Sequence, residues 1–452
     1  MSNVAWTGMQ ASTNANSFMN LTTPIFMPSL SSSSGMDSPF LPRPHGSQAP
    51  ETIGFTDLQA DRQGVDMGGV SYFRYTNNDN DVLKSVTLCA QLSALAPGTG
   101  GLQPRYVDDI CSALLQKIEF YYGGELLQTL YGDEIHYRQM QELPHDELTR
   151  RYQLQAAGLS EMERALLAQN DQYVYFEIPF WWTKNPQSAW HQYAFQRLTR
   201  IVFYFRNATY LVQQNGGTSI PVPGTNQGTT NPVSVLATPG GLYLKNHFLR
   251  FEVTCPSLST KQAYQSMVSA MGESGWPYMI QDFQRIIDIS IAQGTSARWQ
   301  YILNTFTKYG YNLRFWFRPA NNLLPNYLNN YRWITCDVPA MSFDVSGLRY
   351  LQPLDSYYIK HAEIGKYFLG NEQFPIYNIF LNDYPDVSSY GMGGMEFSNT
   401  VNPQINIDFN TTYPVTPVNG IIADFYLECH NYVRLVLDGA KSAAQTIQPI
   451  NS

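Results

Sequence analysis

Hydrophobic and polar residues alternate in short segments along most of the chain after residue 49, and glycine, proline and asparagine separate these segments. Alternation with a period of two is typical of a strand that buries one face of a sheet. Many short strands with turn residues between them indicate β-sandwiches or barrels. The predicted strands lie at 85–95, 117–132 (a hairpin), 173–182, 198–207, 242–255, 285–293, 312–319, 358–364, 376–382, 403–410 and 422–439.

Two places in the first half carry more specific local signals. The pair Gly123-Gly124 predicts a tight turn inside the hairpin, because glycine adopts positive φ without steric cost. The one clear helical pattern covers 142–169 and is interrupted at Gly158. Ser160 and Glu163 then have the spacing of a capping box, which predicts a second short helix.

The chain divides into two β-rich parts of similar size that follow an arm. Residues 1–48 are rich in Ser, Asn, Met and Pro and have too little apolar content to form a core. The arm's apolar residues Phe18, Ile25 and Phe26 are candidate anchors on a neighbouring subunit. We therefore expect an N-terminal arm at 1–48, a first sandwich at 49–256, a helical linker at 257–280, a second sandwich at 281–440 and a C-terminal tail at 441–452.

Composition fits two kinds of protein: one that buries much of its surface against other chains, and an ordinary β-rich protein with long polar loops. Charged residues make up only 14% of the 452 residues, and aromatic residues also make up 14%. Average soluble proteins are about 25% charged. Interfaces favour Tyr, Trp and Arg and are depleted in Lys and Glu. The net charge is −8 and the basic residues are scattered, so direct sequence-specific binding of nucleic acid is not expected.

No motif indicates catalysis or a bound cofactor. The five cysteines are widely spaced and lack metal-ligand spacing, and the P-loop, HExxH and GxSxG motifs are absent. The carboxylate pairs Asp108-Asp109 and Glu161/Glu163 are interpreted as turn and helix-start residues. We therefore predict no enzymatic activity, no cofactor and no metal. The chain also lacks the features of a signal peptide and of a membrane-spanning segment.

Aromatic residues cluster in "FWW" (180–182) and "FWF" (315–317). Such rings could stack on sugars, or they could fill the sandwich cores and the seam between the sandwiches. Successive side chains of a strand point to opposite faces, so Trp181 and Trp182 are not expected to share one core. One of the two is therefore a candidate contact with a second domain or subunit. The candidates for the cores and the seam are Trp181, Trp182, Trp190, Trp316 and Trp333.

Several longer segments carry a family resemblance. They are "KIEFYYGGELLQTLYGDEIHYRQMQEL" (117–143), "FEIPFWWTKNPQSAW" (176–190), "FPIYNIFLNDYPDVSSYGMGGMEFSNTVNPQINIDFN" (374–410) and "ADFYLECHNYVRLVLDG" (423–439). Together they resemble the major capsid proteins of double-stranded DNA viruses, the lineage of large nucleocytoplasmic viruses, virophages and polinton-like viruses. The chain departs from the family where "SSYGMGG" replaces a "PSG" turn, and "FEVTCPSLSTKQAYQ" only loosely echoes the junction motif.

The resemblance implies an all-β fold of two tandem eight-stranded jelly rolls, a double jelly roll, with short helical insertions and an extended N-terminal arm. It also implies homotrimeric, pseudo-hexagonal capsomers that assemble inside the host cell and tile the icosahedral shell of a virion. The implied partners are further copies of the chain, minor capsid and penton proteins, and an internal membrane reached by the arm.

Three other functions stay open on the residues alone. They are a carbohydrate-binding β-sandwich protein (a lectin or adhesin), a glycoside hydrolase with tandem β-domains, and a minor or penton protein of the same kind of virion.

Overall fold

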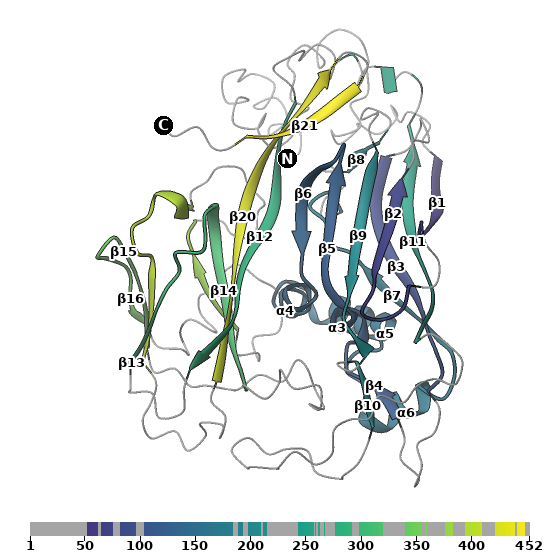
Figure 1. The fold of residues 1–452 in the computed structure, drawn as a ribbon, viewed down its shortest axis with the longest axis horizontal. Helices are drawn as coiled ribbons and strands as arrows, with labels where there is room; N and C mark the ends of the chain where they lie inside the picture. Colours follow the sequence, from purple (N-terminus) through teal and green to yellow (C-terminus); the bar gives the residue numbers. More distant parts are fainter. Residues whose placement is uncertain are drawn as a thin grey trace, which may run out of the picture.

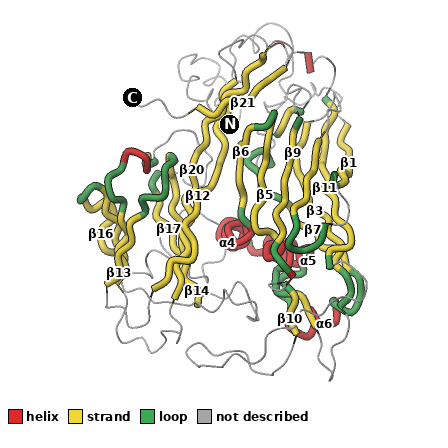
Figure 2. Tube along the Cα trace, in the orientation of Figure 1, coloured by secondary structure: helices red, strands yellow, loops and turns green. Residues whose placement is uncertain are grey.

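The computed structural model consists mainly of antiparallel strands, with a few helices gathered at one end of the first sandwich (Figure 2). It describes residues 52–61, 65–75, 82–95, 104–183, 189–192, 198–208, 211–214, 243–256, 276–291, 298–319, 340–354, 376–382, 394–408, 421–438 and 441–447, with isolated positions at 258, 261–262, 266 and 358.

The first sandwich contains one five-stranded and one four-stranded antiparallel sheet. One has the order β1-β11-β3-β7, and the short strand β8 continues the pairing of β3. The other has the order β2-β9-β5-β6. The strands are β1 (Thr52–Gln59), β2 (Val70–Tyr75), β3 (Val82–Leu92), β5 (Leu115–Tyr122), β6 (Glu125–Leu130), β7 (Gln172–Glu177), β8 (Trp190–His191), β9 (Thr199–Phe205) and β11 (Leu244–Cys255).

The second sandwich repeats this topology beside the first (Figure 1). Its sheets have the orders β12-β20-β14-β17 and β13-β19-β15-β16, while β18 pairs with β14 and β21 with β20. The strands are β12 (Trp276–Ile291), β13 (Arg298–Ile302), β14 (Tyr309–Pro319), β15 (Ala340–Val345), β16 (Leu348–Leu354), β17 (Ile376–Phe380), β18 (Met395–Glu396), β19 (Gln404–Asp408), β20 (Ile421–Asp438) and β21 (Lys441–Ile447).

Both sandwiches have the jelly-roll order. When the eight main strands of each are numbered along the chain, one sheet reads 1-8-3-6 and the other 2-7-4-5. The first and last strands therefore pair, as two Greek keys folded together require. The predicted double jelly roll is confirmed.

One helix lies between β4 (Pro104–Tyr106) and β5, and three more form an insertion between β6 and β7, beside the small sheet of β4 and β10 (Val212–Gln214). The helices are α3 (Ile110–Leu114), α4 (Gly132–Glu142), α5 (His145–Gln155) and α6 (Glu161–Leu167), and the 3₁₀ helix η7 (Phe397–Asn399) lies in the second half. The predicted helical region is correct for α5 and α6 but begins too late, because the pattern did not reveal α4.

The local signals are confirmed where they are most specific. Gly123 and Gly124 have positive φ (60° and 101°) in the turn between β5 and β6. Gly158 lies between α5 and α6 with φ 70°. Ser160 and Glu163 form both hydrogen bonds of a capping box at the start of α6.

Two predicted ranges overlap with strands. β12 begins at Trp276, inside the range 257–280 that we expected to be a helical linker, and β21 lies inside the expected C-terminal tail. The arm 1–48 and most of the predicted strand 358–364 lie outside the described residues.

Each sandwich has its own apolar core, but the first core extends beyond its own strands. The second core is formed by residues of β12 to β20, among them Phe315, Phe343 and Phe425. The first core includes five residues of the second sandwich, which are Ile280, Phe283, Trp316, Ile376 and Tyr426. The two sandwiches are thus continuous in packing, and the seam between them is a buried interior region.

His247 gives the first core a pH dependence. It is buried on β11 between Phe73 and Phe205, and a 2.6 Å hydrogen bond joins its Nε2 to Ser71 Oγ. Burial lowers the pKa of His247 from 6.5 to about 4. The unfolded chain therefore binds a proton between pH 6.5 and 4 that the folded chain excludes, and stability falls as the pH drops through this window.

We predict that His247→Gln weakens this acid sensitivity. The amide can still reach Ser71, but it does not titrate. Urea denaturation at pH 7 and at pH 4.5 measures the free energy of unfolding, and its decrease between these pH values should be roughly 2 kcal/mol smaller in the variant than in the wild type. His145→Gln, at an exposed position, is the control and should keep the wild-type difference. Equal pH dependence in all three proteins would contradict the assignment.

Candidate functional site: the junction between the two sandwiches

The junction is built on α4, whose position depends on a glycine. Gly132 is the first residue of α4, and a Cβ there would lie 2.2 Å from both the Ser112 and Leu115 carbonyl oxygens. Contacts that short do not occur, so any side chain would push α4 away from α3 and β5. The glycine of the "YGD" segment therefore allows α4 to lie close to the first sandwich while its other side faces the second.

α4 presents a row of charged side chains to the second sandwich. Glu134, Arg138 and Glu142 are spaced four residues apart, so they lie along one face of the helix. Nε of Arg138 lies 3.3 Å from Oε1 of Glu134. Glu134 is fully buried and Arg138 is 2% exposed, which is unusual for such residues unless they are paired.

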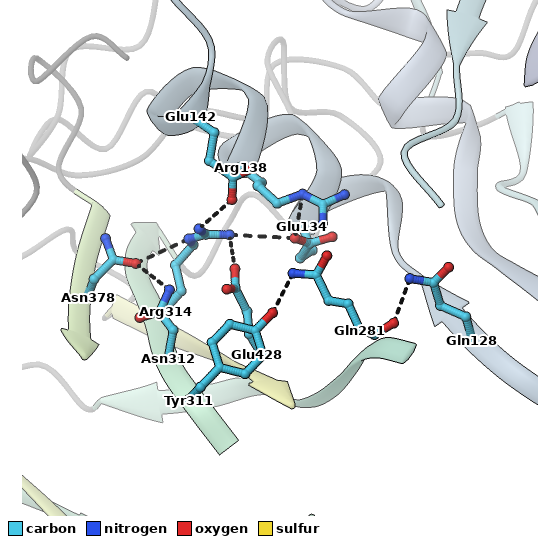
Figure 3. A network of polar contacts seen from close by, with 10 residues as sticks. All are labelled: Gln128, Glu134, Arg138, Glu142, Gln281, Tyr311, Asn312, Arg314, Asn378 and Glu428. Atoms are coloured by element: carbon cyan, nitrogen blue, oxygen red, sulfur yellow. Dashed lines mark hydrogen bonds and ion pairs between the residues drawn. The ribbon is translucent and has the colours of Figure 1, made fainter. Parts of the chain in front are cut away.

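Arg314 on β14 is the centre of the cluster (Figure 3). Its side chain is 0% exposed, and its Nη1 lies 2.7 Å from Glu428 Oε1 on β20 and 3.5 Å from Glu134 Oε1. Its Nη2 lies 3.3 Å from Glu142 Oε1. One guanidinium therefore bridges two carboxylates of the first sandwich and one of the second.

Strand alternation explains why these charges face the junction. On β14, Leu313, Phe315 and Phe317 point into the second core, and Arg314 and Trp316 point the other way. On β20, Phe425 and Leu427 likewise face the second core, and Tyr426 and Glu428 face α4. The sheet β12-β20-β14-β17 thus has two buried faces, one in its own sandwich and one at the junction.

Neutral polar groups extend the cluster. Arg314 Nε and Asn312 Nδ2 both donate to Asn378 Oδ1 at 3.2 Å. Gln281 donates to the Tyr311 hydroxyl, and its backbone carbonyl accepts from Gln128 Nε2 at 2.6 Å (Figure 3). Gln128 lies on β6, so this chain of hydrogen bonds also crosses the junction.

The edge of β6 makes two further links to the second sandwich. The Thr129 amide donates to Asp282 Oδ1 at 2.9 Å, and Asp282 also pairs with Lys308. Asn431 Nδ2 donates to the Leu127 carbonyl at 3.2 Å. Buried backbone groups of β6 therefore find partners on the other sandwich, as they must when water is excluded.

Aromatic rings form the apolar part of the junction. Trp316 lies between Tyr137 of α4, with ring centroids 4.0 Å apart, and Tyr426 of β20, with ring centroids 4.8 Å apart. Tyr131, just before α4, contacts Tyr426, and the guanidinium of Arg285 lies 4.0 Å from the centroid of the Tyr131 ring. Apolar, aromatic and ionic contacts thus bind the two sandwiches together over one continuous surface.

The charges are held in a dry environment that shifts their ionisation. Burial raises the pKa of Glu134 from 4.5 to about 7, although Arg138 and Arg314 act in the opposite direction. For Arg138, burial favours the neutral form, but Glu134, Glu142 and Glu428 outweigh it and leave the pKa above its usual value. The cluster provides cohesion between the two sandwiches.

The structure places three of the candidate tryptophans in the first core. Trp181, Trp182 and Trp190 are all buried, and each packs against the ring of Phe120, with centroids 5.0, 6.2 and 5.7 Å away. Trp316 is the one described candidate that lies at the junction itself. Trp333, Phe18, Ile25 and Phe26 lie outside the described residues.

The expectation that Trp181 and Trp182 would not share a core is wrong. It assumed a strand through 173–182, but β7 ends at Glu177 and residues 181–183 form a turn. Side chains of a turn do not alternate between two faces, so both rings enter one core. The backbone of this turn still reaches the junction, because the Trp181 amide donates to Gln128 Oε1 at 3.3 Å.

The sequence analysis missed the charged residues of the junction. The available signal was the spacing of Glu134, Arg138 and Glu142, which predicts one helical face of charge in a chain where charge is scarce. The pairing with Arg314 and Glu428 could not be read from the sequence, since these residues are separated from α4 by well over a hundred positions.

In the part of the chain that the structure describes, no cluster of His, Cys, Asp and Glu side chains could hold a metal ion. No helix in that part is long and apolar enough to cross a membrane.

Comparisons with known proteins rest on structure alone. No protein-family model matches the chain, and no curated protein matches its sequence. PBCV-1 VP54, as fitted into a reconstruction of the virophage Sputnik, has a TM-score of 0.68 at 12% identity over 90% of this chain and 99% of that chain. The Faustovirus major capsid protein has a TM-score of 0.65 at 10% identity, over 87% and 92% of the two chains.

A chain in the structure of the Sputnik virophage has a TM-score of 0.61 at 10% identity over 90% of each chain. These neighbours are double jelly-roll major capsid proteins. This chain has the double jelly-roll fold that they share.

We predict that Arg314→Met destabilises the full chain by about 3–5 kcal/mol, because it leaves buried carboxylates without their common partner. Urea denaturation at pH 7 measures the loss. Arg298→Met is the control, since Arg298 and Asp408 are about half exposed and 3.9 Å apart, and it should cost about 1 kcal/mol or less. Equal losses in the two variants would contradict the central role of Arg314.

Trp316→Ala should also cost about 3–5 kcal/mol, because it removes the ring between Tyr137 and Tyr426 and leaves a cavity at the junction. Tyr350→Ala, at a ring that is 51% exposed, is the comparison and should cost about 1 kcal/mol or less. Urea denaturation of both variants measures the free energy of unfolding. A decrease for Trp316→Ala as small as that for Tyr350→Ala would contradict the prediction and mean that the junction tolerates the cavity.

Proposed function

We propose that this chain is the major capsid protein of a double-stranded DNA virus. The observation that carries the proposal is the extent of the structural likeness, which spans 90% of this chain and 99% of the PBCV-1 chain. The correspondence thus includes both sandwiches and their side-by-side arrangement, and is not confined to a single jelly roll. A minor or penton protein built on one jelly roll would match only half of such a chain.

The junction supports this role physically. A capsid shell is built from rigid units, and the buried ion pairs and aromatic contacts hold the two sandwiches as one unit. We infer that three chains form a homotrimer in which six jelly rolls surround a three-fold axis in a pseudo-hexagonal outline. Heterologous contacts around such an axis close into a ring, and the rings can then tile an icosahedral shell.

The outer face of the sheet β1-β11-β3-β7 is our candidate for contact with a second copy. Phe55 and Ile53 on the edge strand β1 are 70% and 62% exposed, and Tyr173 and Tyr175 on β7 are also exposed. Large exposed apolar side chains on one face of a sheet mark an interaction surface. The composition, rich in tyrosine and poor in charge, agrees with a protein that buries such faces.

The remaining partners and the location follow from the same proposal. In a virion, the chain would contact neighbouring capsomers and minor capsid and penton proteins. The arm 1–48 would reach another subunit or an internal membrane.

Carbohydrate binding is less well supported by the described residues. A sugar-stacking platform needs exposed aromatic faces, but Trp181, Trp182, Trp190 and Trp316 are buried among other rings. Their burial assigns these residues to packing.

We predict that the full chain, expressed alone, forms a trimer. Light scattering after size exclusion should give a mass near 154 kDa, three times the 51.3 kDa of one chain. The mass should persist in high salt, because apolar contacts are not screened. A stable monomer would contradict the proposal.

A matched pair of variants tests the proposed contact surface. Phe55→Ser should shift the population towards monomer. Met162→Ser, at a position on α6 with a similar exposure of 71%, should leave the trimer intact. If Phe55→Ser forms trimers as well as the wild type does, the contact uses a different face.

A further inference from the structure

Among the residues that the structure describes, the ionic cluster at the junction contains more carboxylates than cations. Glu134, Glu142 and Glu428 surround the guanidinium groups of Arg138 and Arg314. If every group were ionised, three negative charges would face two positive charges in a site largely closed to water. An unbalanced charge in such a site is costly, and a protein commonly avoids the cost by binding a proton.

Geometry identifies the carboxylate that carries the proton. Glu428 lies 2.7 Å from Arg314 and is well paired, and the side chain of Glu142 is 23% exposed and can be hydrated. Glu134 has no exposed surface, and its nearest cations are 3.3 and 3.5 Å away. It is thus the driest of the three, and both of its contacts with cations are longer than the contact between Glu428 and Arg314. Its position in the first turn of α4 favours the ionised form, but only modestly.

The other titratable groups described around the junction have contacts of their own, and Arg285 lies over the ring of Tyr131. On β12, Asp282 pairs with Lys308. On β14 and β20, the Tyr311 hydroxyl accepts from Gln281, and its ring stacks on His430, whose pKa is lowered to about 4 by burial. On the far side of α4, His136 pairs with Asp109 at the start of α3. None of these pairs supplies the missing positive charge to Glu134.

We propose that the two sandwiches close around one additional proton held on the Glu134 carboxyl, so that the strength of the junction depends on pH. Protonated Glu134 leaves two carboxylates opposite two guanidinium groups, which is a balanced cluster. Loss of the proton leaves one excess negative charge between the sandwiches. The proposal does not depend on a capsid role, because it concerns contacts within one chain.

The direction of the effect follows from linkage. An exposed Glu134 in an open or unfolded chain releases its proton near pH 4.5, and the closed junction keeps it until about pH 7. Between these values closure takes up a proton, so the stabilisation is complete below pH 4.5 and is lost as the pH rises to 7. The equilibrium constant for closure should fall roughly tenfold per pH unit across the middle of this window. Buried His247 and His430 act in the opposite direction, so only a comparison between variants isolates Glu134.

The test compares Glu134→Gln with the wild type in the full chain. The amide is close in shape to the protonated carboxyl but cannot lose a proton. Urea denaturation at fixed protein concentration measures the folding equilibrium constant of both proteins from pH 5 to pH 7. The ratio of the wild-type constant to that of Glu134→Gln should fall roughly tenfold per pH unit. Glu125→Gln, at an exposed position on β6, is the matched control and should follow the wild type. Parallel curves for the wild type and Glu134→Gln would overturn the proposal.

Two further measurements keep the test decisive if Glu134→Gln does not fold. Glu142→Gln removes the charge excess without altering Glu134, so its pH dependence between pH 5 and 7 should be weaker than that of the wild type. Infrared difference spectra of the wild type between pH 6 and pH 8 should show loss of a protonated carboxyl band, and Glu125→Gln should retain this change. A Glu142→Gln curve parallel to the wild type, or spectra without the band, would overturn the proposal.

Discussion

Arg314 has no exposed surface, and the arrangement of the two sandwiches depends on it. A guanidinium ion buried without partners would cost far more free energy than a domain can supply, so its carboxylates must be brought to it. Two of them come from α4 and one from β20. The need to neutralise this charge therefore fixes the position of α4 against the sheet of the second sandwich. The aromatic contacts of Trp316 further stabilise the arrangement of the two sandwiches that the ion pairs already specify.

The sheet β12-β20-β14-β17 shows how a two-domain chain meets this constraint. A sheet in a sandwich usually buries one face and leaves the other in water. Here both faces are buried, and their chemistry differs. The face towards the second core is apolar, whereas the face towards α4 combines Arg314, Glu428 and Asn378 with two aromatic rings. The polar face gives the junction a specific register, since the ion pairs form in only one placement of the two sandwiches.

The sequence predicted the fold well because its signals are local. Alternation marked most of the strands, the Gly123-Gly124 turn fixed the first hairpin, and Ser160 with Glu163 marked the start of α6. The site was less predictable because it is made of contacts distant in sequence. Alternation wrongly separated Trp181 from Trp182, since the strand stops at Glu177 and the chain turns. The charged face of α4 was visible as a four-residue spacing, but its partners on β14 and β20 were not.

The order of synthesis gives the junction one more property. α4 leaves the ribosome early in synthesis, but Arg314 follows much later and Glu428 lies on β20, near the end of the chain. A nascent first sandwich can therefore close its own jelly roll once β11 is made, while Glu134 and Arg138 remain hydrated. Contacts between elements so distant along the chain form late. The last main strand of the second jelly roll thus completes both that roll and the contacts between the two rolls, so an incomplete chain lacks the finished side-by-side unit.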